Sequence, residues 1–165
     1  VWWELENRLL LAYIGKPHES SAVHKMVIAG LGADPSRDAR LERLRQLARG
    51  APAALQAGDF TALGRIFDDN TAVQRALHKN LVCPAFEDII ATAREFRALG
   101  CKVNGAGGDG GSIAVLTSGD MARKRALQKV LEQKGYRTLP IYLSRRGLRV
   151  WASPPAAAPL PAEAP

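Results

Sequence analysis

The feature that most constrains this chain is a glycine-rich stretch that runs directly into an apolar segment. Five of the seven residues from Gly105 to Gly111 are glycine, and the run Ile113–Leu116 follows after a single serine. Glycine lacks a Cβ, so successive backbone N–H groups can turn to one side and let a ligand or another segment come close. The pattern predicts either a loop that cradles an anion ahead of an interior strand, or a tight turn into that strand without a ligand.

Length and composition indicate one globular domain. A chain of 165 residues, 47% hydrophobic and 24% charged, can bury a sizeable core. Its apolar runs are too short to cross a bilayer and its first residues do not resemble a signal peptide, so we expect a cytoplasmic protein without membrane association. Cys83 and Cys101 lack the spacing of metal ligands, which favours two reduced thiols over a disulfide.

The basic charge of the chain allows two interpretations. A net charge of +7 is compatible with a surface that binds nucleic acid or attracts anionic substrates. The charges are spread along predicted helices, however, and only 6% of the residues are aromatic and could stack on bases. The pattern therefore favours solvated helix faces over a nucleic-acid partner.

The first third of the chain predicts one strand followed by helices. The apolar run at residues 8–14 is typical of a buried strand. Ser20 or Ser21 can cap the helix that follows. Asp34-Pro35 predicts the start of another helix, and Pro52 should kink or divide it because its ring removes a backbone donor.

The central part predicts two further helices and then the glycine-rich stretch. Asp59 can cap one helix, and a second should run from Pro84 to Leu99 with Gly100 as its C-terminal stop. Residues 102–118 predict a loop and one strand. Asp120 can cap the helix that comes next.

The last part predicts a hairpin and a tail. Residues 137–144 and 148–152 are typical of two strands joined by Arg145-Arg146-Gly147. Residues 153–165 are rich in Pro and Ala, which predicts a disordered tail after a domain of residues 1–152. The order of elements indicates an α+β fold with helices on an antiparallel sheet.

The glycine-rich stretch also resembles a known motif. Lys102-Val-Asn-Gly-Ala-Gly-Gly-Asp-Gly-Gly111 is similar to the third motif of the GHMP kinases, the superfamily of galactokinase, homoserine, mevalonate and phosphomevalonate kinases. Asp109 departs from the motif, which usually has glycine at that step. The run Leu5–Gly15 resembles the opening strand of the C-terminal half in the sugar-kinase branch. The resemblance implies a ferredoxin-like antiparallel sheet with several helices packed on it.

The resemblance further implies a function. GHMP kinases transfer the γ-phosphoryl group of ATP to a hydroxyl with the help of Mg²⁺, and the opening strand favours a sugar or sugar phosphate over mevalonate-type or homoserine-type substrates. The family's ATP-wrapping segment, Pro-x-x-x-Gly-Leu-Gly-Ser-Ser-Ala, has no counterpart in the sequence. We therefore expect half an enzyme, inactive alone, that pairs with an N-terminal GHMP domain or a second copy of the chain.

The resemblance places Gly105, Ala106, Gly107, Gly108, Asp109 and Gly110 beside the phosphoryl-transfer site. The alternative is that the glycines only permit close packing. The carboxylate of Asp109 would repel phosphates, which leaves a magnesium ion, a substrate hydroxyl or solvent as its partner, and we expect solvent. No residue qualifies as a catalytic group or a metal ligand.

Other polar residues give weaker indications. Ser20 and Ser21 are expected to cap a helix, although a helix N-terminus could also contact a sugar phosphate. Asp68 and Asp69 are adjacent on a helix and should not converge on one substrate. Lys102 is expected to be a solvent-exposed strand lysine. The main alternative function is a non-catalytic ferredoxin-like module that binds an anionic metabolite or a partner subunit.

Overall fold

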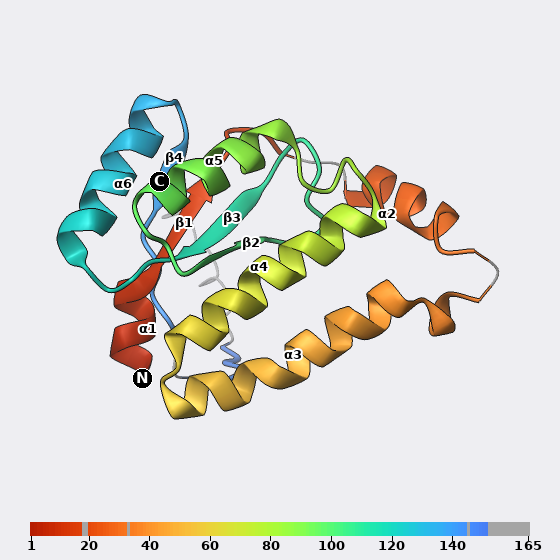
Figure 1. Ribbon diagram of the computed structural model, residues 1–165, viewed down its shortest axis with the longest axis horizontal. Coiled ribbons are helices and arrows are strands. Elements are labelled where there is room, and N and C mark those ends of the chain that lie inside the picture. The colour runs from red at the N-terminus through yellow and green to blue at the C-terminus, as the bar shows by residue number, and fades with distance from the viewer. Residues whose placement is uncertain (18–19, 33, 145, 152–165) are drawn as a thin grey trace, which may run out of the picture.

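The computed structural model describes the chain except residues 18–19, 33, 145 and 152–165. Helices and strands mix in an α+β arrangement, as the sequence predicted (Figure 1). The helices are α1 (Trp2–Arg8), α2 (Ser20–Ala29), α3 (Ala39–Ala57), α4 (Phe60–Leu77), α5 (Pro84–Glu95) and α6 (Met121–Gln133), and Pro35–Arg37 form a 3-10 turn. The strands are β1 (Leu9–Tyr13), β2 (Gly100–Val103), β3 (Ser112–Leu116) and β4 (Arg137–Leu139). Among the helices described, none has the length and apolar character that crossing a bilayer requires.

The four strands form one antiparallel sheet in the order β2-β3-β1-β4. Leu10 pairs with Val115 and Ala12 with Ile113, so alternate residues of the two central strands share one face. Helices α5 and α6 cover that face, while α4 runs along the edge strand β2 with α3 outside it (Figure 1). This is the helix-covered antiparallel sheet that the resemblance implied.

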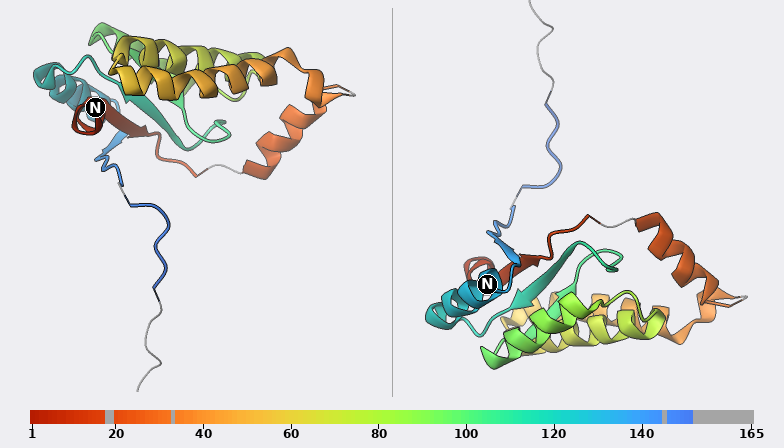
Figure 2. Two further views of the ribbon diagram at one scale, coloured as in Figure 1. Left: turned by 90° about the horizontal axis from the view of Figure 1, so that it is seen from below. Right: turned by 90° about the horizontal axis from the view of Figure 1, so that it is seen from above.

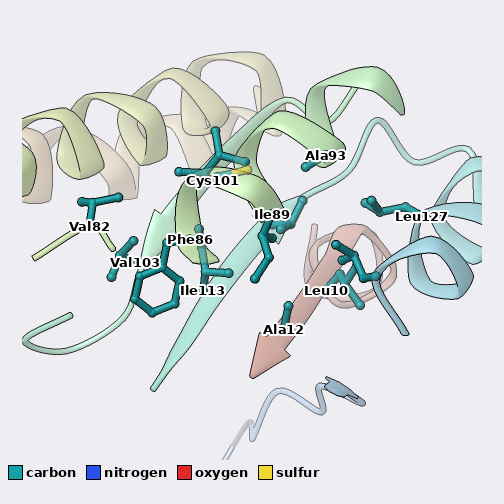
Figure 3. Close-up of a cluster of buried hydrophobic side chains, with 13 residues drawn as sticks. Leu10, Ala12, Val82, Phe86, Ile89, Ala93, Cys101, Val103, Ile113 and Leu127 are labelled. Atoms are coloured by element: carbon teal, nitrogen blue, oxygen red, sulfur yellow. The ribbon is translucent and has the colours of Figure 1, made fainter. Parts of the chain in front are cut away.

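One hydrophobic core fills the space between the sheet and its covering helices (Figure 3). Its buried members are Leu10, Ala12, Val82, Phe86, Ile89, Ile90, Ala93, Cys101, Val103, Ile113, Val115, Leu127 and Leu131. The strand residues alternate along each strand, and the helix residues recur at the helical period, as burial of one face requires. The helix that begins at Pro84 contributes Phe86, Ile89, Ile90 and Ala93 from one face.

A second cluster joins the helix pair α3 and α4 to the sheet. Phe60 and Leu63 of α4 pack with Leu116 of β3, and the Arg8 guanidinium lies 4.5 Å from the centre of the Phe60 ring. Arg8 also donates a hydrogen bond to the Ser118 carbonyl. These contacts hold the end of α1 against the sheet, so the expected opening strand begins only at residue 9 and the residues before it are helical.

Aspartates begin three of the long helices. Asp59 and Asp120 accept hydrogen bonds from amides in the first turns of α4 and α6, which confirms both predicted caps. The predicted start at Asp34-Pro35 is confirmed only for the 3-10 turn, where Asp34 accepts a hydrogen bond from the Ser36 amide at 3.1 Å and Pro35 is the first residue. The long helix α3 starts later, because Asp38 caps it through the Arg40 amide at 2.8 Å.

Pro52 does not divide α3, contrary to one part of the prediction. The carbonyl that loses its donor belongs to Ala48. Both Pro52 and Ala48 are exposed, so water can replace the missing N–H. A proline on the solvent face therefore leaves the helix continuous.

Gly100 is not the helix stop that the sequence predicted. Helix α5 ends at Glu95, Arg97 takes the left-handed conformation with φ +58°, and Gly100 opens β2, a strand that the sequence analysis did not predict. A Cβ on Gly100 would overlap the Gly64 carbonyl of α4. Glycine is required here because a helix and a strand touch through their backbones.

The predicted C-terminal hairpin does not form in the residues that the structure describes. Strand β4 ends at Leu139, and residues 146–151 are outside regular structure. Leu148 is 95% exposed and Trp151 is 82% exposed. Alternation of apolar residues did not produce a strand, because neither a core nor another strand lies against this segment. The turn residue Arg145 and the predicted tail 153–165 lie outside the described residues.

Candidate functional site

The glycine loop, residues 104–111, connects the antiparallel strands β2 and β3. At its base the Asn104 amide donates to the Ser112 carbonyl at 3.0 Å, and the Asn104 side chain donates to the Ser112 hydroxyl at 3.1 Å. Gly105, Gly107 and Gly108 have φ angles of +61°, +64° and +93°. L residues adopt this left-handed conformation only with strain, so the glycines determine the path of the loop.

Two neighbouring segments hold the glycine loop in place. The Gly108 amide donates to the Leu81 carbonyl at 3.1 Å, and the last amide of the loop donates to the Lys16 carbonyl at 2.9 Å. A Cβ on Gly107 would overlap the Leu81 carbonyl, and one on Gly110 would lie 2.6 Å from the Lys16 carbonyl oxygen. For Gly107 and Gly110, close packing inside this chain is sufficient to require glycine.

A cavity of about 600 Å³ lies beside the loop. It is lined by Pro17, Val23, Met26, Lys79, Asn80, Cys83, Pro84, Gly108 and Asp109. Figure 2 shows α2, which supplies two of these side chains, at the end of the molecule far from α1 and α6. The volume is typical of small-molecule sites. Apolar walls with one cation, one amide and one carboxylate can hold a small molecule that has both polar and apolar parts.

The predicted loop residues differ in their surroundings. Gly108 and Asp109 line the cavity, and Asp109 is exposed. Gly105 is also exposed, and a Cβ there would meet no atom within 4 Å. Ala106 is half-buried. The open part of the loop therefore consists of Gly105 and Asp109. Gly108 lines the cavity but is buried, and a Cβ there would lie 3.1 Å from Val23, whereas Gly107 and Gly110 face neighbouring backbone.

Of the two predicted serines, Ser21 is exposed and is not part of the cavity lining. Helix α2 begins at Ser20, so Ser21 lies inside the helix and not at the predicted capping position before it. Val23 and Met26 are the α2 residues that line the cavity. The side chain of Ser20 and the whole of His18 lie outside the described residues.

The adjacent carboxylates do not converge, as the sequence predicted. Asp68 accepts a hydrogen bond from the Cys101 amide at 2.9 Å, and Asp69 pairs with Arg43 at 2.6 Å. Lys102 corrects a prediction, since it is half-buried and its amine donates to the carbonyl of its own strand neighbour, Val103, at 3.3 Å. Burial lowers the pKa of the Lys102 amine.

In the described part of the chain, the cysteines form no disulfide and the candidate metal ligands do not cluster. Both Cys83 and Cys101 are free thiols. Burial raises the pKa of Cys101 to about 12, so it remains a protonated core residue. Cys83 is half-buried at the cavity wall. No group of three His, Cys, Asp or Glu side chains comes together among the residues described.

Sequence reasoning missed two buried polar residues on α4. Thr71 is 2% exposed and Gln74 is 8% exposed. The Thr71 hydroxyl donates to the Cys101 carbonyl at 2.8 Å and accepts from the Val103 amide at 3.2 Å, and the Gln74 amide donates to the Gly105 carbonyl at 3.2 Å. The sequence did carry a signal, because both residues continue the apolar stripe of α4 at positions where a core residue is expected.

Comparison with protein families gives one match. The family described as GHMP kinases C terminal matches residues 51–137, which is more than half of the chain. No curated protein sequence matches at a significant level.

Solved structures show the same fold. Mevalonate kinase from L. major, solved in complex with R-mevalonate, is 26% identical with a TM-score of 0.63, over 76% of this chain and 38% of that one. Phosphomevalonate kinase from Streptococcus pneumoniae, in complex with phosphomevalonate and AMPPNP, is 15% identical with a TM-score of 0.67, over 81% and 39%. The Lin0012 protein from Listeria innocua is 14% identical with a TM-score of 0.71, over 83% and 39%.

Two consequences follow from these comparisons. The chain spans about two fifths of the length of the matched structures. The predicted sugar-kinase branch finds no support in them, because the matched kinases act on mevalonate and phosphomevalonate.

Proposed function

Because this chain belongs to the GHMP kinase C-terminal family, we propose that it forms the C-terminal part of an ATP-dependent kinase that phosphorylates a small alcohol. The observation that carries the proposal is the glycine loop with its left-handed glycines beside a cavity of about 600 Å³. Phosphoryl transfer depends on positioning and charge stabilisation, which backbone amides can supply without reactive side chains. In this proposal, Gly105 and the Gly108-Asp109 step border the transferred group.

For the substrate, we favour an alcohol of the mevalonate type, which carries an anionic group besides its reacting hydroxyl. The 26% identity with the L. major mevalonate kinase supports this class. Lys79 and Asn80 at the cavity wall offer a cation and an amide that suit a carboxylate or a phosphate. A sugar or sugar phosphate, which the opening strand suggested, is the alternative that an assay must separate.

ATP and Mg²⁺ would be bound by different kinds of groups. ATP supplies the phosphoryl group, and the open, left-handed part of the loop is compatible with a nearby phosphate. Magnesium prefers oxygen ligands in an octahedral arrangement. Asp109 is the only carboxylate among the described residues that line the cavity. We therefore propose that most ligands of a magnesium ion come from ATP and from another domain.

We also propose that activity requires an N-terminal GHMP domain or a second copy of the chain. The described lining of the cavity offers one carboxylate, Asp109, and one amine, Lys79, so the remaining groups for phosphoryl transfer would come from the partner. Beside it, α2 leaves Met26 37% exposed and Ile28 63% exposed. A partner domain that covers these side chains would complete the cavity and exclude water from it.

A phosphorylation assay tests the proposed function. R-mevalonate, phosphomevalonate, homoserine and galactose are offered with ATP and Mg²⁺ to the purified chain, alone and together with a GHMP N-terminal domain. We expect no turnover by the chain alone and turnover of a mevalonate-type alcohol by the pair. Turnover by the chain alone would contradict the need for a partner. Preference for galactose would establish the sugar alternative, and inactivity of the pair on all four compounds would favour a non-catalytic binding module.

A further inference from the structure

Side chains of helix α4 form hydrogen bonds with the backbone at the outer edge of β2, where another strand could otherwise pair. Because β2 is an edge strand, its outward backbone groups have no strand partner. Three side chains at three-residue spacing on α4 meet this edge, and we call them the edge ladder: Asp68, Thr71 and Gln74. Asp68 and Thr71 together bond the Cys101 amide, the Cys101 carbonyl and the Val103 amide.

A backbone contact sets the position of the helix against the strand. Gly64 of α4 and Gly100 of β2 are so close that a Cβ on either would overlap the backbone of the other segment. The edge ladder starts one turn further along α4 and follows β2 toward the glycine loop. Helix and strand therefore run side by side in the same direction, from this contact to Gly105.

The helix and the strand differ in their rise per residue, and this difference explains which side chains the edge ladder uses. Six residues of helix, from Asp68 to Gln74, rise roughly 9 Å. The strand ends at Val103 and the loop begins at Asn104, so the four residues from Cys101 to Gly105 span at most roughly 13 Å. The helix therefore falls short of the chain by up to about 4 Å at Gly105. Short side chains reach the strand at the start, and the longer glutamine is needed at the last step.

The last contact, made by Gln74, has an energetic cost because it buries a polar side chain. Its side chain is 8% exposed, and its Oε1 has no hydrogen-bond partner among the described residues. Burying an amide oxygen without a partner is unfavourable, and an apolar residue would avoid that cost at a core position. What Gln74 provides in return is the 3.2 Å hydrogen bond to the Gly105 carbonyl.

We infer that Gln74 is a positioning residue, which fixes the first glycine of the glycine loop to α4 and so orients the loop beside the cavity. The second half of the loop is held by hydrogen bonds from its amides to the Leu81 and Lys16 carbonyls. Gln74 holds the first half of the loop, at Gly105. Its importance for catalysis rests on the proposed function, whereas its effect on the loop does not.

Amide hydrogen exchange on the purified chain tests the effect on the loop. Gln74→Met keeps the volume of the side chain but removes the donor, and Gln133→Met at the exposed end of α6 is the matched control. We expect exchange of the Gly108 amide to become about tenfold faster in Gln74→Met, the equivalent of one hydrogen bond. Exchange of the Val115 amide in the core strand should stay unchanged in both variants. Unchanged exchange at Gly108 would overturn the inference.

A second variant separates the hydrogen bond from packing. In Gln74→Glu an ionised carboxylate cannot donate to the Gly105 carbonyl, but a protonated one can. Burial raises the pKa of such a carboxyl, so protonation should occur at mildly acidic pH. We expect Gly108 protection in Gln74→Glu to recover between pH 7 and pH 5, relative to Gln74→Met at the same pH. Equal protection of the two variants across this range would contradict a role for the donor.

Kinetics of the chain paired with a GHMP N-terminal domain provide the third measurement. We expect Gln74→Met to lower kcat about tenfold, the effect of a misplaced loop, and Gln133→Met to leave kcat unchanged. An unchanged kcat in Gln74→Met would overturn the catalytic part of the inference. If the wild-type pair has no kinase activity, the proposed function fails, and the exchange experiments still decide whether Gln74 positions the loop.

Discussion

Helices α4 and α2 both lie beside the glycine loop, and they differ in how much of their surface is buried against the rest of the molecule. Helix α4 buries Phe60, Leu63, Gly64, Thr71 and Gln74 and bonds the edge of β2 over most of its length. Helix α2 buries only Val23 among its described side chains and leaves Ile28 63% exposed. The difference indicates that α4 is the fixed support of the glycine loop, and that the α2 side, which lines the cavity, is where a ligand or partner can enter.

One arginine joins the two helices. Arg40 donates to the Gly30 carbonyl after α2 and to the Ala76 carbonyl in α4, each at 3.1 Å, while Asp38 holds its guanidinium at 2.6 Å. This group lies at the end of α2 away from the cavity. It can restrain where α2 ends without fixing the residues that line the site.

The largest expected effect is at the contact between α4 and β2. Gly64→Ala places a methyl group into the Leu99 carbonyl, so we expect it to lower the free energy of unfolding by about 3 kcal/mol. The control is Gly50→Ala in α3, where the new Cβ lies 3.8 Å from Ile66 in ordinary contact. That change should be neutral or stabilising by up to about 1 kcal/mol, because alanine favours helix. Urea denaturation measures both, and equal effects would show that α4 is not the fixed support of the loop.

A smaller effect distinguishes the packed and open parts of the glycine loop. Gly107 and Gly105 have nearly the same φ, +64° and +61°, so alanine at either costs about 1 kcal/mol of backbone strain. Only at Gly107 would the Cβ also overlap the Leu81 carbonyl. We expect Gly107→Ala to be more destabilising than Gly105→Ala by about 1–3 kcal/mol in thermal or urea unfolding. Equal destabilisation would mean that the loop is not clamped at Leu81.

The smallest effect concerns the link between the helices and depends on pH. Hydrogen bonds from the Arg40 guanidinium lower the pKa of Asp38 to about 2, from an ordinary value of 3.8. A lowered folded-state pKa contributes stability above the ordinary value, and this contribution is lost as the pH falls from about 4 toward 2. The stability difference between wild type and Asp38→Asn should therefore shrink over that range in urea titrations. A difference that stays constant from pH 7 to pH 2 would contradict the link.

Much of the fold could be predicted because local chemistry determines it. Asp59 and Asp120 cap their helices with their own side chains, and the helix after Pro84 buries the stripe that its periodicity shows. The glycine loop was found in the same way, since left-handed backbone needs glycine wherever it occurs.

The failed predictions depended on contacts between distant segments. Gly100 looked like a helix stop, but its role is to touch Gly64, which lies far away in the sequence. Residues 148–151 alternate like a strand, yet their apolar side chains are exposed among the residues that the structure describes. Gln74 could be recognised as a polar residue in an apolar stripe, whereas its partner, the Gly105 carbonyl, is visible only in the structure.

Turnover of a Gly108→Val variant tests the central claim most directly, namely that the cavity-lining part of the glycine loop borders the transferred phosphoryl group. Gly108 has φ +93° and lines the cavity. Gly135→Val is the control, because Gly135 has φ +89°, has no atom within 4 Å of a new Cβ, and follows α6 outside the cavity. Both variants carry similar backbone strain, and the Gly108 variant adds a contact of 3.1 Å between its new Cβ and the Val23 side chain, so circular dichroism must show that both remain folded. In the chain paired with an N-terminal domain, we expect kcat to fall at least about tenfold in Gly108→Val and to stay near wild type in Gly135→Val. Wild-type kcat in Gly108→Val would contradict the claim and make the loop a connector between two strands.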